Sequence, residues 1–186
     1  MSFEIKGLGP ADQRYVMQLT PMILDTLHKA AGALQRGGGT AESSRWFGDA
    51  SKPWLTTLAS DLNHMASVIN LETITIGFRP IARRKGSVAV ALPPEDGWGK
   101  YTRLSNARGQ NFRMQLDTAW NTAPLLCTAS EGDSMFQTLV HELSHLVIGT
   151  DDEQYGFAEC QALARQAPAR AKNNADSWGY FVEDFR

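Results

Sequence analysis

The chain has few cysteines and no long hydrophobic run, and each absence excludes a class of protein. Only two of its 186 residues are cysteines, Cys127 and Cys160, so a framework of several disulfides is excluded. No stretch approaches the roughly 20 apolar residues of a membrane-spanning helix, and we expect no membrane insertion. Residues 1–7 lack the apolar core of a signal peptide. We therefore expect synthesis in the reducing cytoplasm, with both thiols as small buried residues.

Positive charge is not in excess either. Lysine and arginine number 18 against 20 aspartates and glutamates, which gives a formal net charge of −2. That balance argues against a nucleic-acid partner held through its phosphates. The basic cluster Arg83–Lys85 lies between two strand-like runs, and we interpret it as a solvated turn. With 42% hydrophobic and 20% charged residues, the composition is typical of one globular domain over residues 1–186.

Hydrophobic periodicity divides the chain into helices, a small sheet and further helices. The expected helices span residues 11–35, 54–69, 134–148, 157–165 and 176–185. The expected strands span residues 73–78, 87–92 and 111–116, with a long surface loop at 95–110. Pro21 predicts a kink or break near Thr20 in the first helix. This order predicts an α+β domain with N-terminal helices, a small and mostly antiparallel sheet, and C-terminal helices.

The most informative segment, residues 141–145, reads H-E-x-x-H. On a helix, residues four apart share a face, so both histidines can reach one zinc ion. Glu142 is then close enough to take a proton from a zinc-bound water. Ser134 and Gln137 predict a capping box that begins the helix, and Gly149 stands where a left-handed cap ends it. The apolar residues gather on one side and the histidines on the opposite side, which we expect to face a cleft.

A catalytic zinc needs a third protein ligand and an open position for water. The sequence offers three candidates. Asp151 stands where a metzincin has its third histidine, but no methionine follows Met135 to form that family's methionine turn. Glu159 would serve a thermolysin-like arrangement. Asp152, just past the turn that follows the helix, is the third.

Residues 149–156 read G-T-D-D-E-Q-Y-G, and the pattern G-T-x-D-x-x-Y-G after H-E-x-x-H resembles the aspzincins. These are zinc endopeptidases that include deuterolysin-like and peptidyl-Lys-specific members. Segments 45–48 and 174–181 are similar to the family's R-Y-x-x-W-F-G and N-A-D-x-Y-x-Y-F regions. The resemblance implies a zincin-like fold that covers most of the chain.

Carried over residue by residue, the resemblance implies one Zn²⁺ ion bound by His141, His145 and Asp152. It implies Glu142 as the general base and Tyr155 as the phenol that hydrogen-bonds the developing oxyanion. A protein or peptide is then the expected substrate.

Lysine-specific members of the family carry an acidic pair, three residues apart, in the C-terminal segment. Here the first position is Asp176 and the second is Gly179. The resemblance therefore implies an incomplete lysine pocket, in which Asp176 contacts the substrate. The alternative is a structural role, in which Asp176 bonds its own backbone at a helix start.

The sequence thus predicts a zinc-dependent endopeptidase. Such an enzyme in its own cytoplasm needs narrow specificity, an inhibitor or immunity protein, or export by a non-classical route as a toxin or effector. The strand at 111–116 is the nearest to the zinc motif in sequence, and we predict it as the sheet edge on which substrate adds as a strand. Two alternatives stay open: a metal hydrolase acting on a non-peptide amide, and a catalytically silent zinc-binding interaction module of the same fold.

Overall fold

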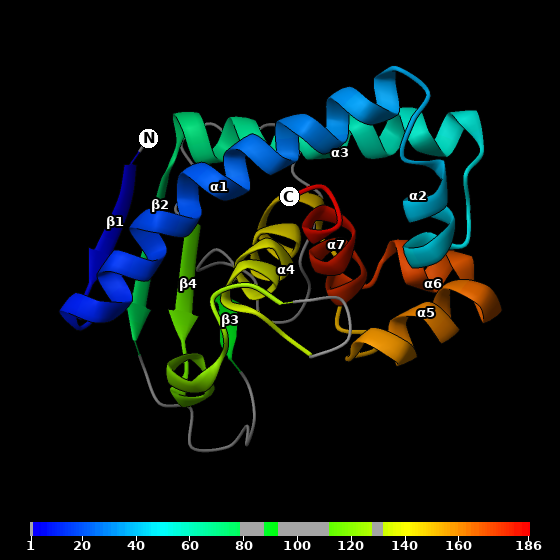
Figure 1. Cartoon of the computed structure of the whole chain (residues 1–186). Helices are drawn as coiled ribbons and strands as arrows, with labels where there is room; N and C mark the ends of the chain where they lie inside the picture. Colours follow the sequence, from blue (N-terminus) through cyan, green and yellow to red (C-terminus); the bar gives the residue numbers. More distant parts are fainter. Residues whose placement is uncertain (1, 79–87, 93–111, 128–131) are drawn as a thin grey trace.

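The computed structural model describes residues 2–78, 88–92, 112–127 and 132–186 (Figure 1). The strands are β1 (Ser2–Lys6), β2 (Thr73–Phe78), β3 (Ala89–Leu92) and β4 (Phe112–Leu116). The α-helices are α1 (Pro10–Gln35), α2 (Thr40–Phe47), α3 (Lys52–Leu71), α4 (Met135–Ile148), α5 (Phe157–Gln166), α6 (Pro168–Lys172) and α7 (Ala175–Glu183). A short 3₁₀ helix spans Thr118–Thr122. The α+β class is confirmed, whereas the turn expected at 83–85 and the loop expected at 95–110 lie outside the described residues.

The sheet is mixed, so the prediction of a mostly antiparallel sheet is wrong. Its strand order is β1-β2-β4-β3, and only the β3–β4 pair is antiparallel. Both β1–β2 and β2–β4 are parallel. A parallel pair needs a crossover connection, and helices α1 to α3 supply it between β1 and β2. Strand β1, which pairs with β2 in parallel, is absent from our predictions.

The predicted edge strand at 111–116 is also wrong in its position. Strand β4 is internal: Phe112 pairs with Ile74 of β2 on one side, and Met114 pairs with Ala91 of β3 on the other. Sequence proximity to the zinc motif does not decide the order of strands in a sheet. Among the described strands, β3 is the outer one on this side, and it packs against α4.

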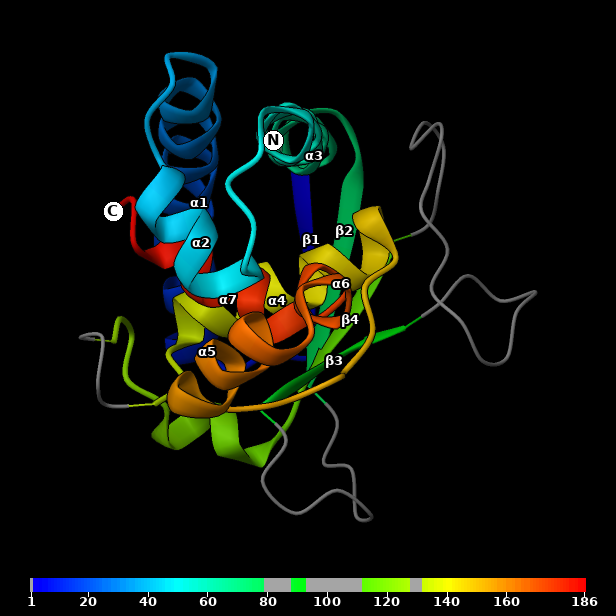
Figure 2. The ribbon, with the colours of Figure 1, turned by 90° about the vertical axis from the view of Figure 1, so that its right-hand side faces the viewer.

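Helices α1 and α3 pack along each other and cover one side of the molecule (Figures 1 and 2). We predicted a kink or a break near Thr20, and a break does not occur: α1 continues through Pro21. Pro21 lacks the amide that would bond the carbonyl of Met17, but both residues lie on the exposed face of the helix, where water can take that carbonyl. Within the described part of the chain, no helix is long and apolar enough to cross a membrane.

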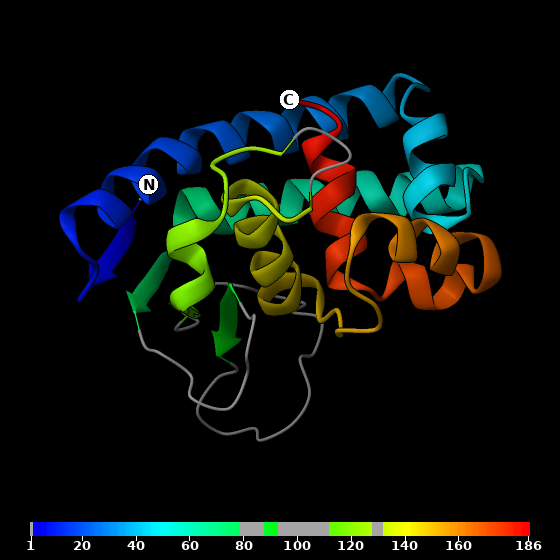
Figure 3. The ribbon, with the colours of Figure 1, turned by 60° about the horizontal axis from the view of Figure 1, so that its bottom comes forward.

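Helix α4 runs through the middle of the molecule, between β3 and α7 (Figure 3). Its predicted ends are confirmed: the Ser134 hydroxyl accepts the amide of Gln137 at 2.9 Å, and Gly149 has a left-handed φ of 79°. Every residue from Met135 to Val147 is buried, including the face that carries the histidines. That face packs inside the protein, so each polar side chain on it needs a hydrogen-bond partner.

Helix α7 is buried throughout and lies alongside α4. Aromatic side chains fix it against α2: the rings of Trp46 and Tyr180 stack at 5.0 Å, and those of Phe47 and Trp178 lie 5.3 Å apart. Helices α2, α5 and α6 gather at this end of the molecule (Figure 1). The C-terminal segment therefore belongs to the core and can hold neighbouring loops in fixed positions.

Both cysteines are buried, as predicted. Burial raises the pKa of the Cys160 thiol to about 12. This thiol therefore stays protonated and acts as a small packing residue.

Candidate metal centre

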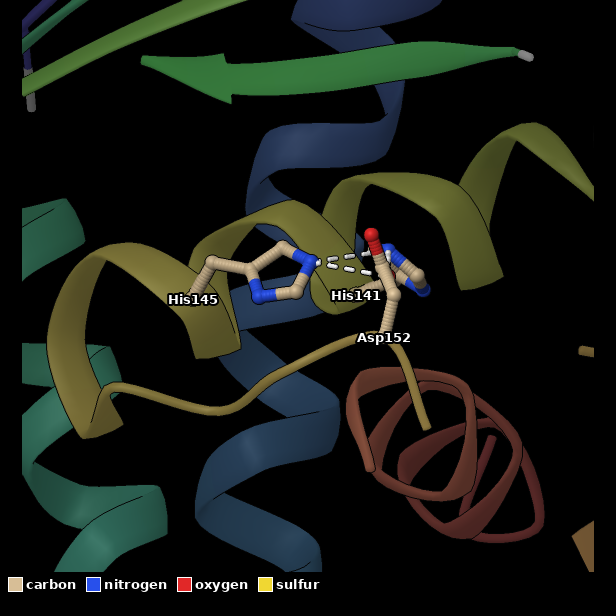
Figure 4. Close-up of side chains that lie close together, drawn as sticks. All are labelled: His141, His145 and Asp152. Atoms are coloured by element: carbon tan, nitrogen blue, oxygen red, sulfur yellow. Dashed lines mark hydrogen bonds and ion pairs between the residues drawn. The ribbon is translucent and has the colours of Figure 1, made fainter. Parts of the chain in front are cut away.

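Three side chains from two segments converge beside the middle of α4 (Figure 4). His141 and His145 lie one turn apart, with their Nε2 atoms 3.1 Å from each other. Asp152 comes from the loop that follows α4, and its Oδ1 lies 3.1 Å from His141 Nε2 and 3.2 Å from His145 Nε2. The Asp152 side chain keeps 29% of its surface exposed, whereas both histidines are buried. The cluster is thus closed on the protein side and open toward solvent at Asp152.

The other ring nitrogen of each histidine has a fixed partner. His141 Nδ1 lies 2.7 Å from Asp176 Oδ1, and His145 Nδ1 lies 2.6 Å from the carbonyl oxygen of Thr150. A carbonyl can only accept a hydrogen bond, and so can an ionised carboxylate, so each Nδ1 carries a proton and donates it. When the ring is neutral, its Nε2 then presents a lone pair to the shared point. Two imidazole nitrogens and one carboxylate oxygen are a donor set that catalytic zinc uses, so these residues fit the ion.

The electrostatics of the cluster agree with a bound cation. Burial raises the pKa of Asp152, but its hydrogen bonds with His141 and His145 outweigh that effect and hold the pKa below its usual range. Burial lowers the pKa of His141, but its hydrogen bonds to Asp152 and Asp176 outweigh that effect and raise the pKa well above its usual range. A proton and a metal ion therefore compete for the same place between these atoms.

Glu142 lies between the cluster and the sheet. It is buried, its Oε2 accepts the amide of Ala91 on β3, and its Oε1 lies 3.9 Å from His141 Nε2. Burial raises the pKa of Glu142, although the neighbouring histidines oppose that rise. A carboxylate with a raised pKa beside a metal-ligand cluster is suited to take up a proton and return it.

Tyr155 lies beside the cluster, on its solvent-exposed side. Its side chain is exposed, and its ring is nearly parallel to that of His141 at a centroid distance of 6.3 Å. The phenol is therefore near the metal-ligand atoms and accessible from solvent, where a substrate can meet it.

Asp176 has a different position from the one expected. Its carboxylate is buried and has three partners: Oδ1 accepts from His141 Nδ1 and from Gln137 Nε2 at 2.9 Å, and Oδ2 accepts from the amide of Gly156 at 3.0 Å. These partners come from α4 and from the metal-ligand loop. Asp176 thus fixes the Nδ1 side of the His141 ring. This contact is neither of the two that we expected, which were an exposed contact with the substrate and a bond to its own backbone at the helix start.

At position 179, where lysine-specific members of the family carry the second acidic residue, atoms of Gln137 occupy the space that a side chain would need. A Cβ atom on Gly179 would lie 2.8 Å from Gln137 Cγ and 2.9 Å from the Gln137 carbonyl oxygen. Both distances are too short for a non-bonded carbon, and the second atom belongs to the backbone of α4. The close approach of α7 to α4 therefore requires glycine at this position.

The two alternative third ligands lie elsewhere. Glu159 is exposed on α5, and Asp151 is exposed and accepts the side-chain amide of Asn173 at 3.0 Å. Among the residues that the structure describes, the one group of three that could hold a metal ion consists of His141, His145 and Asp152.

The residues that support this group were not among the predicted site residues. The Thr150 hydroxyl lies 2.7 Å from that of Ser144, which keeps Thr150 in place for His145. The side chain of Asn174 accepts the amides of Glu153 and Gln154. The motifs contain these residues, but their partners lie across the fold, where spacing gives no signal.

Comparison with known proteins points to one family. A sequence profile of the aspzincins, described as lysine-specific metallo-endopeptidases, matches residues 33–183. A peptidyl-Lys metalloendopeptidase of Pleurotus ostreatus is 34% identical over 147 residues, which cover 78% of this chain and 74% of that protein. An extracellular protease of Aeromonas hydrophila is 44% identical over 77 residues, covering 40% of this chain and 21% of that protein. A solved structure of a zinc peptidase from Grifola frondosa matches with a TM-score of 0.73 at 25% identity, over 95% of this chain and 97% of that one.

Proposed function

The chain belongs to the aspzincin family of zinc metalloendopeptidases, and we propose that it hydrolyses peptide bonds in protein or peptide substrates with one zinc ion. The observation that carries the proposal is the convergence of His141, His145 and Asp152 beside a buried Glu142. These residues supply a metal-ligand set and a proton acceptor in one place, which are the parts that metal-assisted hydrolysis needs.

His141 and His145 would bind the ion through their Nε2 atoms, and Asp152 through Oδ1. When bound, zinc acts as a Lewis acid toward the substrate carbonyl and lowers the pKa of the attacking water. Asp176 and the Thr150 carbonyl keep both imidazoles in the Nδ1–H tautomer, so their Nε2 atoms stay available.

Glu142 is the proposed general base. Because Oε2 already accepts the amide of Ala91, Oε1 is the oxygen that takes the proton from water and delivers it to the leaving amine. Burial favours the protonated carboxyl between these two steps. A peptide whose scissile bond reaches Glu142 must pass close to β3, since Ala91 contacts the same carboxylate.

Tyr155 is the proposed donor to the oxyanion that forms on the scissile carbonyl. Its exposure and its position beside His141 support this role, because the phenol lies on the solvent side of the cluster, where the substrate carbonyl would bind.

We further propose that cleavage shows no strong preference for lysine, although the relatives from Pleurotus and Armillaria are named for it. A lysine ammonium needs an accessible carboxylate. Asp176 is buried and already accepts three hydrogen bonds, and Gly179 leaves no room for a second acid.

The test is to digest a denatured protein mixture with the zinc-loaded chain and read the new termini by mass spectrometry. Glu142→Gln is the matched control, because it keeps the shape of the side chain and removes its basicity. Cuts that vanish in this variant and after chelation would support the proposal. Zinc binding without cuts in this mixture would favour the silent binding module or the non-peptide hydrolase, and lysine after most cuts would overturn the specificity proposal.

The expected export and the expected inhibitor or immunity protein remain proposals. They are supported by the harm that an endopeptidase would do in the cell that makes it. Expression of the wild-type chain and of Glu142→Gln in a host cytoplasm tests this: equal growth would contradict the need for protection.

A further inference from the structure

The loop that carries Asp152 and Tyr155 has no regular secondary structure, and both side chains reach toward solvent. A loop of this kind needs external anchors if it is to hold a metal ligand within a few tenths of an ångström. Its anchors lie in the segment Asn173–Asp176, at the start of α7.

Asn174 makes the principal anchor. It is completely buried, and its Oδ1 accepts the consecutive amides of Glu153 at 3.0 Å and Gln154 at 2.9 Å. Its Nδ2 donates to Ser177 Oγ at 3.0 Å and to Cys160 Sγ at 3.3 Å. A side-chain amide offers two donors and one oxygen with two lone pairs, so its capacity is fully used. The two backbone N–H groups can only donate, so the oxygen of the Asn174 side chain must face the loop.

Backbone bonds complete the clamp on the other side of Asp152. The amide of Asp151 donates to the carbonyl of Asn173 at 2.8 Å, and the amide of Ala175 donates to the carbonyl of Asp151 at 3.0 Å. The residues immediately before and after Asp152 are therefore both tied to one short segment of the core. Asp152 makes its contacts with the histidines from a backbone position that Asn174 helps to set.

We infer that Asn174 is a positioning residue for the third metal ligand, an inference that rests on the proposed function. Its side chain is fully buried, and its hydrogen bonds go to Glu153, Gln154, Cys160 and Ser177, not to the metal-ligand atoms. It acts through the backbone of residues 153 and 154, which adjoin Asp152 on one side and Tyr155 on the other. Loss of this anchor loosens Asp152 while α4 and its two histidines stay in place.

The test measures zinc affinity by competition with a chelator, in Asn174→Ala and Asn174→Asp, beside the wild type. Partners that orient a ligand are typically worth about 10- to 100-fold in metal affinity, and we expect that loss in Asn174→Ala. In Asn174→Asp a carboxylate oxygen can still accept both loop amides, while Ser177 and Cys160 can donate to the other oxygen. We therefore expect Asn174→Asp to bind zinc far more tightly than the alanine variant.

Asn173→Ala is the matched control. It removes the same side chain from the adjacent position, where the lost bond joins the exposed Asp151 carboxylate. We expect it to bind zinc like the wild type, with the metal-free melting temperature recorded for every variant.

Three outcomes would overturn the inference or the function. Wild-type zinc affinity in a folded Asn174→Ala would refute the positioning role. Should the alanine variant fail to fold, a folded Asn174→Asp that lost zinc would refute it too, because the acceptor for the loop is retained. A wild-type chain that bound no zinc would refute the proposed function instead.

Discussion

Asp176 gives the sharpest test of how the metal centre is held. Replacement by alanine removes the acceptor for three donors: His141 Nδ1, Gln137 Nε2 and the amide of Gly156. A buried donor left unpaired costs about 1–3 kcal/mol, so the sum would be about 3–9 kcal/mol if nothing relaxed. The Gly156 amide lies in a partly exposed loop and the Gln137 side chain can rotate. We therefore expect a loss near the lower end, about 3 kcal/mol.

Asp176→Asn separates geometry from charge. Its oxygen can still accept from His141 and Gln137, but its amide group then faces the amide of Gly156, donor against donor. We expect about 1–3 kcal/mol of destabilisation from this single mismatch. Zinc affinity should fall about 10- to 100-fold, which corresponds to about 1.4–2.7 kcal/mol, because the His141 ring loses a charged partner.

Urea unfolding of the metal-free protein measures the first quantity, and chelator competition measures the second. Glu159→Gln is the control, because it removes a carboxylate that is exposed on α5 and outside the cluster. An Asp176→Asn variant that binds zinc and unfolds in urea like the wild type would refute this role of Asp176, and so would a loss of zinc binding in Glu159→Gln.

Three further predictions test other parts of the structure. Asp152→Ala should weaken zinc binding and abolish peptide cleavage; full zinc affinity and activity in this variant would remove Asp152 from the site. Gly179→Ala should lower the free energy of unfolding by about 1–3 kcal/mol through overpacking against Gln137, and an unchanged urea midpoint would contradict the tight contact between α4 and α7. Asp49 has its pKa lowered to about 2, chiefly by its hydrogen bond with Lys172. Because the folded pKa lies below the unfolded one, this stabilisation is present above about pH 4 and is lost as the pH falls through about 2. Wild type and Asp49→Asn should therefore differ by less than about 1 kcal/mol at pH 6, and by nothing measurable near pH 2.

Local features of the fold and site could be predicted from the sequence. Helix α4 begins at a serine cap and ends at a left-handed glycine, and both signals involve residues three to four positions apart or a single backbone angle. The H-E-x-x-H spacing likewise places His141 and His145 on one face by helix geometry alone. Such patterns depend on the chain's own periodicity, so no tertiary information is needed to read them.

Contacts between distant segments could not be predicted in this way. Asp176 meets His141 across 35 positions and Gln137 across 39. The position of β4 inside the sheet depends on β2 and β3, which pair with it from separate parts of the chain. The cover over the histidine side of α4 could not be predicted for the same reason: the amphipathic pattern shows one apolar side and predicts a cleft at the other, but β3 and α7 also pack against this helix and every residue from Met135 to Val147 is buried.

That burial explains why the site is so completely hydrogen-bonded. A polar side chain on a helix covered from all sides must find partners inside the protein or destabilise it. On α4, Gln137 and His141 donate hydrogen bonds to Asp176, and His145 donates one to the Thr150 carbonyl. Glu142 accepts a hydrogen bond from the amide of Ala91. These contacts hold the histidines and the base through groups of the protein itself. Zinc should therefore add stability by mass action to a folded chain, and metal removal should lower the melting temperature while α4 stays helical.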